Sequence, residues 1–271
     1  MFFIRRTGIV LLICVYILLN LTNTAVLASD DKVAVNLNSL KKGLVKISCT
    51  SSGNKRIKVI IQKDGHKYTY DLKNDGSYES FPLQMGNGGY RVSILKNVKE
   101  NKYAFLKTEF LSLELNNENA VFLNSIQNIS WDKDCKVAKA ASELTKGLKD
   151  DECKIKALYA YIVDNFDYDY DKMKKVKEGY VPDLNVFMRT RRGICYDFSS
   201  LFAAMSRSVG IPAKLIKGNA KSVTGYHSWN EVYIKGRWVI VDTATDAQLK
   251  EGKDLFLAEK SPEEYIKDKE Y

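Results

Sequence analysis

The chain has 271 residues, enough for one or two domains. Its 42 Lys and Arg exceed its 33 Asp and Glu, which gives a formal net charge of +9. The lysines are scattered among acidic residues, and the chain has no nucleic-acid-binding motif, so no nucleic-acid partner is expected. With two histidines and no metal-ligand spacing, neither a metal site nor a cofactor is predicted.

Residues 1–28 have the pattern of a secretory signal peptide. Two arginines precede an apolar run over residues 9–21, and Val26-Leu27-Ala28 forms a cleavage site before Ser29. This run is shorter than the ~20 residues of a membrane-spanning helix, so we predict cleavage without stable membrane insertion, with an uncleaved anchor as the alternative. Loss of the two arginines lowers the net charge from +9 to +7. The pattern predicts a secreted or envelope-associated protein, and the Lys-, Asn-, Ile- and Tyr-rich composition suggests a bacterial one.

Residues 30–125 show the period-two alternation of β-strands. Leu44–Cys49, Ile57–Ile61 and Tyr90–Ile94 are examples, separated by turns that contain Gly, Asn and Asp. Short strands at such spacing predict a small antiparallel β-sandwich. Nothing in this region carries chemistry. We interpret it as a spacer or packing partner for the second domain rather than as a module that binds a wall polymer.

A polar, Asn-rich stretch over residues 116–131 marks the boundary with a second domain at 130–271. Apolar residues at helical spacing predict one helix over 134–148 and another that begins after Asp150 or Asp151. A tyrosine- and aspartate-rich stretch at 166–171 follows; it lacks the spacing of a calcium loop, so we interpret it as solvated. Ser261-Pro262-Glu263-Glu264 predicts a short C-terminal helix.

Cys195 is predicted to lie in the first turn of a helix. Apolar residues recur at helical spacing from Phe198 to Val209, and Gly210 and Pro212 form a stop signal. Free backbone N–H groups and the helix dipole favour a thiolate over a thiol at this position. Gly193 is expected to allow a sharp turn and close approach of a substrate.

His227 and Asp242 are predicted to lie on one β-hairpin with a turn at Lys235-Gly236. If Ile234 pairs with Arg237, Asp242 lies opposite Trp229. His227 and Asp242 are then diagonal neighbours on one face, ~7–8 Å apart at the backbone. Cys, His and Asp in these settings suit a thiol nucleophile, a general base and acid, and a group that orients the imidazole.

Several motifs together resemble the bacterial transglutaminase-like (papain-type) superfamily. They are Gly-Ile-Cys-Tyr-Asp-Phe at 193–198, Gly-Ile-Pro at 210–212, Tyr-His-Ser-Trp-Asn-Glu-Val at 226–232, and Gly-Arg-Trp with Val-Asp-Thr between 236 and 243. The resemblance covers residues 130–271 and implies an α+β fold in which a helix-borne Cys packs on an antiparallel sheet. It implies Cys195, His227 and Asp242 as catalytic residues. One departure is that Asp242-Thr243-Ala244-Thr245 lacks the aromatic that many relatives carry here.

The implied activity is acyl transfer from amide bonds of a protein or peptide through a thioester. An amine as the second nucleophile would make the protein a cross-linking transglutaminase, and water would make it a protease or amidase, acting for example on cell-wall peptides. The sequence leaves both open. A different class, a non-catalytic exported binding or assembly protein on the same fold, is the alternative.

The remaining site residues and the other cysteines are less constrained. The Cys195 backbone N–H is a candidate oxyanion donor, and Tyr180 is the candidate for the second donor. Trp229 is a candidate cleft wall, although large residues on a sheet face are more often core. Cys135 and Cys153 are a candidate disulfide, with buried free thiols as the default, and Cys49 is expected in the sandwich core.

Overall fold

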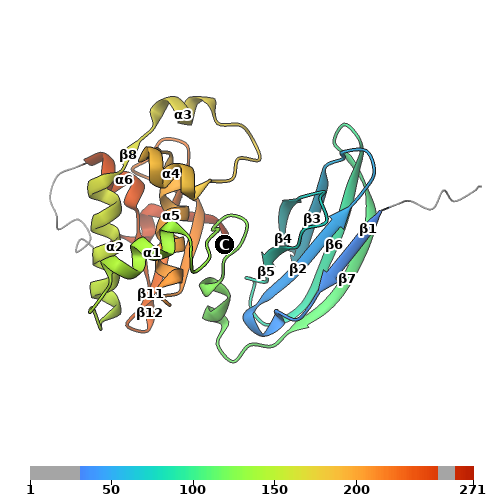
Figure 1. The fold of residues 1–271 in the computed structure, drawn as a ribbon, viewed down its shortest axis with the longest axis horizontal. Helices are drawn as coiled ribbons and strands as arrows, with labels where there is room; N and C mark the ends of the chain where they lie inside the picture. Colours follow the sequence, from blue (N-terminus) through green and yellow to red (C-terminus); the bar gives the residue numbers. More distant parts are fainter. Residues whose placement is uncertain (1–30, 250–259) are drawn as a thin grey trace, which may run out of the picture.

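The computed structural model describes residues 31–249 and 260–271 and has two lobes (Figure 1). Strands β1 to β7 form one lobe, and the later strands with the α-helices form the other. The signal peptide predicted for residues 1–28 lies outside the described residues.

The first lobe is a β-sandwich of two antiparallel sheets, ordered β1-β2-β5 and β4-β3-β6-β7. Side chains from both sheets form one core, which includes Val45, Ile47 and Cys49 of β2. The predicted sandwich and the core position of Cys49 are therefore confirmed. The elements are β1 (Lys32–Asn36), η1 (Leu40–Lys42), β2 (Leu44–Thr50), β3 (Ile57–Lys63), β4 (His66–Leu72), β5 (Glu79–Pro82), β6 (Gly88–Lys99) and β7 (Lys102–Leu113).

The second lobe has a four-stranded antiparallel sheet, ordered β12-β11-β10-β13. Its elements are η2 (Glu118–Leu123), α1 (Lys136–Leu144), α2 (Asp151–Asn165), β8 (Asp167–Tyr168), α3 (Tyr170–Lys175), α4 (Leu184–Thr190), β9 (Arg192–Gly193), α5 (Cys195–Ser208), β10 (Ala213–Ala220), β11 (Tyr226–Ile234), β12 (Arg237–Val241), α6 (Thr243–Leu249), η3 (Pro262–Glu264) and β13 (Tyr265–Glu270).

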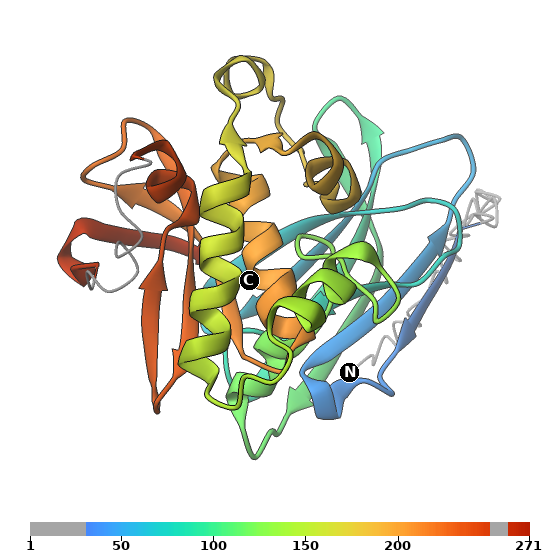
Figure 2. The same ribbon diagram turned by 60° about the vertical axis from the view of Figure 1, so that its left-hand side comes forward.

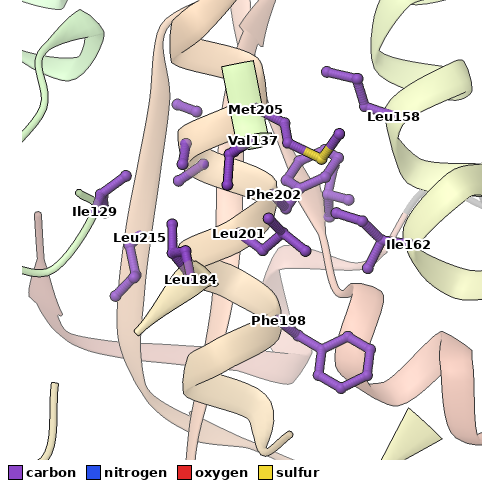
Figure 3. Packing of buried hydrophobic residues seen from close by; sticks show 14 of the residues in the cluster. Ile129, Val137, Leu158, Ile162, Leu184, Phe198, Leu201, Phe202, Met205 and Leu215 are labelled. Atoms are coloured by element: carbon purple, nitrogen blue, oxygen red, sulfur yellow. The ribbon is translucent and has the colours of Figure 1, made fainter. Parts of the chain in front are cut away.

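Helix α5 is the centre of this lobe, with 12 of its 14 residues buried. One side packs on β10 and β11, and α2 runs beside it (Figure 2). Phe198, Leu201, Phe202 and Met205 of α5 meet side chains of neighbouring elements such as Ile162 of α2 (Figure 3). The helix ends at Ser208, and Gly210 follows with φ +84°, which confirms the predicted stop.

Both helices predicted before the site are present, and the first is shorter than predicted. Helix α1 spans only Lys136–Leu144, because Cys135 caps its start through a bond from the Ala138 N–H to sulfur. Helix α2 begins at Asp151, and the Asp150 carboxylate accepts the Cys153 N–H as its cap.

The predicted C-terminal helix is wrong. Ser261-Pro262-Glu263-Glu264 starts only one 3-10 turn, and the chain continues as strand β13. Strand β10 offers a row of backbone groups at its free edge, and β13 pairs with them from Tyr265 onwards. Pairing with an open sheet edge outweighs a local helix start signal.

Arg207 joins the end of α5 to the segment after η2, to the start of β10 and to Tyr271 after β13. Its guanidinium is 2% exposed and donates to the carbonyls of Asn124, Ala213 and Tyr271 at 2.6, 2.9 and 2.8 Å. Burial lowers the pKa of Arg207 to about 9. The Tyr271 ring in turn packs edge-on against Tyr68 and Tyr70 of the sandwich. One buried cation therefore fixes the segments that connect the two lobes.

We predict that Arg207→Leu lowers the free energy of unfolding by about 3 kcal/mol, because three carbonyls lose their donor inside the protein. Guanidinium denaturation followed by circular dichroism measures this. Arg189→Leu, at an exposed position of α4, is the matched control and should change stability by less than about 0.5 kcal/mol. Equal losses of stability from the two substitutions would contradict the stabilising role of the Arg207 hydrogen bonds.

Candidate active site

Cys195 is the first residue of α5, as predicted. Ile194 precedes the helix, and its N–H donates to the Asp197 carboxylate at 2.8 Å. The Asp197 N–H donates back to the Ile194 carbonyl at 2.8 Å. This closed turn presents the Cys195 N–H and side chain at the positive end of the helix, where negative charge on sulfur is stabilised.

Gly193 is required by space rather than by an unusual backbone angle. A Cβ at this position would lie 2.7 Å from the Phe187 ring and 2.8 Å from the Asp197 side chain. The expected sharp turn is therefore not the reason for this glycine. Its missing side chain lets Phe187 and Asp197 close around the residues before Cys195.

The β11–β12 hairpin has the predicted register. Ile234 pairs with Arg237, and Asn230 pairs with Val241. The turn residues Lys235 and Gly236 have φ values of 49° and 79°, which is the type I′ geometry that fixes a two-residue hairpin. His227 Nε2 lies 2.8 Å from Asp242 Oδ2, and both side chains are buried. The diagonal contact predicted from residue spacing is therefore present.

Asp242 is fully buried and has several hydrogen-bond partners besides His227. Oδ1 accepts the Thr245 N–H at 3.1 Å, and Oδ2 accepts the hydroxyls of Thr245 at 2.8 Å and Tyr265 at 3.2 Å. Burial opposes the charge on Asp242, but the bonds from His227 and Thr245 outweigh it and keep the pKa of Asp242 below its ordinary value. Thr245, part of the departure from the family pattern, thus fixes the carboxylate.

His227 contacts Cys195 on one side and Asp242 on the other. With Nε2 on Asp242, Nδ1 is the ring nitrogen left for Cys195, whose side chain interacts with the imidazole. Burial disfavours the imidazolium, but the bonds to Asp242 and Cys195 outweigh this and raise the pKa of His227 well above its ordinary value. The structure therefore brings Cys195, His227 and Asp242 into one connected group.

Tyr168 is a site residue that sequence reasoning missed. Strand β8 pairs parallel with β9, so that Tyr168 lies opposite Gly193, and the Asp169 N–H donates to the Gly193 carbonyl at 2.8 Å. The Tyr168 hydroxyl lies near Cys195 and interacts with both its backbone N–H and its side chain. Burial is the main reason that the pKa of Tyr168 is raised. The only signal in the sequence was its place in the tyrosine-rich stretch before the helix.

Tyr180 and Trp229 lie near the site in positions other than those predicted. The Tyr180 hydroxyl donates to the Asp197 carboxylate, which also accepts Lys172 Nζ at 2.7 Å. It is Tyr168, not Tyr180, whose hydroxyl contacts Cys195. Trp229 is 1% exposed and packs between the rings of His227 and Tyr265, so it supports the histidine from behind instead of forming a cleft surface.

The four cysteines in the described part of the chain are free thiols. Cys135 caps α1 and Cys153 is exposed on α2, so the candidate disulfide is not formed, and burial as the default is wrong for Cys153. Within residues 31–249 and 260–271, no group of three or more metal-binding side chains is found. The helices in the same ranges are too short or too polar to cross a membrane.

A thiol at a helix start lies beside a histidine–aspartate pair on an antiparallel sheet, as the sequence motifs predicted. Residues 138–243 match the family model of the transglutaminase-like superfamily. The second lobe is therefore a transglutaminase-like domain.

Relatives are similar at low identity. Kyphoscoliosis peptidase of Mus musculus is 27% identical over 114 residues, 38% of this chain but only 17% of that protein. UPF0252 protein MJ1282 of Methanocaldococcus jannaschii is 26% identical over 250 residues, 83% of this chain and 67% of the relative. A crystal structure of a candidate cysteine protease from Cytophaga hutchinsonii has 16% identity and a TM-score of 0.44, covering 83% of this chain and 82% of that one.

We predict that His227 is still protonated at pH 7.5 and that Asp242→Asn lowers its pKa, because the carboxylate that stabilises the imidazolium is lost. The chain has two histidines, so proton NMR resolves two imidazole titrations, and His66→Gln identifies the other signal. A His227 titration that Asp242→Asn leaves unchanged would contradict the pairing.

Proposed function

We propose that the protein is a thiol hydrolase or acyltransferase that acts on amide bonds of proteins or peptides. The observation that carries the proposal is the buried His227–Asp242 pair in contact with Cys195 at the start of α5. The name of the mouse relative, a peptidase, favours water as the second nucleophile and hence hydrolysis; amine transfer, as in a transglutaminase, is the alternative outcome. The predicted signal peptide supports action outside the cytoplasm, with cell-envelope peptides as one substrate class.

In the resting site, His227 holds the proton and Cys195 is the thiolate. The sulfur attacks the carbonyl carbon of the amide, and the carbonyl π electrons move to oxygen. The Cys195 N–H is placed to donate to this oxyanion, and the Tyr168 hydroxyl, now beside the same N–H, is placed to rotate and donate as a second group.

The intermediate collapses when the C–N bond breaks, and His227 transfers its proton to the leaving amine nitrogen. The product is a thioester on Cys195. The neutral imidazole then takes a proton from water, or from an acceptor amine, as that nucleophile attacks the thioester. Collapse of the second intermediate releases the acid, or the new amide, and restores the thiolate and imidazolium.

Asp242 has two roles in this scheme. Its bond to Nε2 holds the ring so that Nδ1 faces sulfur, and its charge stabilises the imidazolium between the two proton transfers. Thr245 and Tyr265 keep the carboxylate in place through both steps.

The first test is alkylation of the native protein by iodoacetamide at pH 6.5, with each cysteine followed by peptide mass mapping. Cys195 should react at least about tenfold faster than exposed Cys153, and His227→Ala should remove the difference. Release of fluorescent peptides from labelled casein then measures hydrolysis, and dansylcadaverine incorporation measures amine transfer. Cys195→Ala should abolish both hydrolysis and amine transfer. Equal labelling of the two cysteines, with neither activity, would instead identify a non-catalytic binding protein.

A second prediction concerns Tyr168. Tyr168→Phe should lower kcat about a hundredfold while leaving the alkylation rate of Cys195 within about threefold, because an oxyanion donor acts only in the transition state. Tyr180→Phe is the matched control, because it also removes a tyrosine hydroxyl, one that bonds Asp197. It should lower kcat less than about tenfold. A larger loss of kcat in Tyr180→Phe than in Tyr168→Phe would contradict the role of Tyr168 as an oxyanion donor.

A further inference from the structure

Lys217 is a partly buried cation beside the site that the mechanism does not use. It lies on β10, where it pairs with Ser228 while the next residue, Gly218, pairs with His227. Its Nζ is 3.5 Å from the centre of the Tyr196 ring and 5.6 Å from that of Tyr271. Tyr196 directly follows Cys195, so this ring holds the ammonium at the same end of α5 as the nucleophile.

Within the described residues, Lys217 forms no ion pair or hydrogen bond, unlike its neighbours. Lys214 on the same strand pairs with Glu270 at 3.1 Å, and Lys267 on β13 pairs with Glu231 at 2.9 Å. The residue opposite Lys217 on β13 is another cation, Lys269, whose ammonium bonds the Lys67 carbonyl. An ammonium withdrawn from water without a counter-ion is costly, which makes it a candidate functional group rather than a stabilising one.

Lys217 also interacts electrostatically with the Cys195 side chain, the reacting group of the proposed mechanism. Burial lowers the pKa of Lys217 to about 8, and Cys195 acts in the opposite direction. At neutral pH the lysine is thus a cation, held on a ring at the same end of α5 as the reacting atom. Formation of the thioester would remove the sulfur charge and leave Lys217 without an anion, unless the substrate supplies one.

We propose that Lys217 is the anion-binding residue of a substrate subsite and that the acyl donor carries a carboxylate next to the reacting amide. The proposal rests on the function proposed above and narrows its substrate class. Peptides with a free carboxyl terminus or an acidic residue beside the scissile bond have this chemistry. The ammonium binds the carboxylate as an ion pair, and the Tyr196 ring keeps the ammonium in position.

The test compares two alkylating reagents of similar size, iodoacetate, which carries a carboxylate, and iodoacetamide, which is neutral. Their rates at Cys195 are measured by peptide mass mapping on the full chain. Lys217→Met should lower the iodoacetate rate on the order of tenfold, because the reagent's carboxylate loses the attraction of one nearby positive charge. The iodoacetamide rate should change less than about threefold, and Lys217→Arg should preserve the wild-type ratio.

Lys214→Met is the matched control, because it removes a partly buried, ring-packed lysine of the same strand and should leave the ratio unchanged. Lys217→Met should also raise Tm, since an uncompensated charge is removed. If Lys217→Met leaves the ratio of the iodoacetate rate to the iodoacetamide rate unchanged, or slows both reagents equally, the anion subsite is overturned. The proposed function stands in that case. Wild-type Cys195 that reacts no faster than Cys153 with either reagent overturns the proposed function, and the subsite with it.

Discussion

The Asp197 carboxylate accepts hydrogen bonds from the Ile194 N–H, the Lys172 ammonium and the Tyr180 hydroxyl, although it is entirely buried. These groups come from the helix start and from the loop region between β8 and α4. A buried carboxylate is tolerated only when it is paired and hydrogen-bonded, and here the Lys172 ammonium supplies the opposite charge. The position of Cys195 depends on this constraint, because the same carboxylate closes the turn that begins α5.

Strand β13 extends the constraint to the rest of the molecule. Its pairing with β10 completes the sheet, its first residue Tyr265 donates to Asp242, and Gln84 of the sandwich region donates to the Glu270 carbonyl at its end. The following residue, Tyr271, packs on the sandwich and accepts from Arg207. The sandwich therefore contacts the strand that helps orient Asp242. A flexible spacer would not make such contacts, so the sandwich is better described as a packing partner of the second lobe.

The parts of the site that were predictable from the sequence are those fixed by local rules. A two-residue turn sets a hairpin register, so counting from Lys235-Gly236 was enough to bring His227 and Asp242 together. The helix start at Cys195 followed from apolar spacing and a glycine stop. Tyr168 was missed because a two-residue parallel bridge has no periodicity to detect, and β13 was missed because its partner edge is some 50 residues away in the sequence. Gly193 was singled out for the wrong reason, since crowding by Phe187 and Asp197 is visible only in three dimensions.

The raised pKa of His227 affects two steps of the proposed reaction in opposite ways, and the contacts of the imidazole reconcile them. A strongly held proton favours the thiolate–imidazolium pair but makes the imidazolium a poor acid towards the leaving amine. Two partners raise this pKa, Asp242 and Cys195. When the sulfur forms its bond to the acyl carbon, it loses its negative charge and can no longer stabilise the imidazolium. The pKa of His227 then falls towards the value that Asp242 alone supports, at the step in which the proton must be transferred. In the proposed mechanism the nucleophile thus controls the strength of its own general acid, while Asp242, held by Thr245 and Tyr265, stays constant through the cycle.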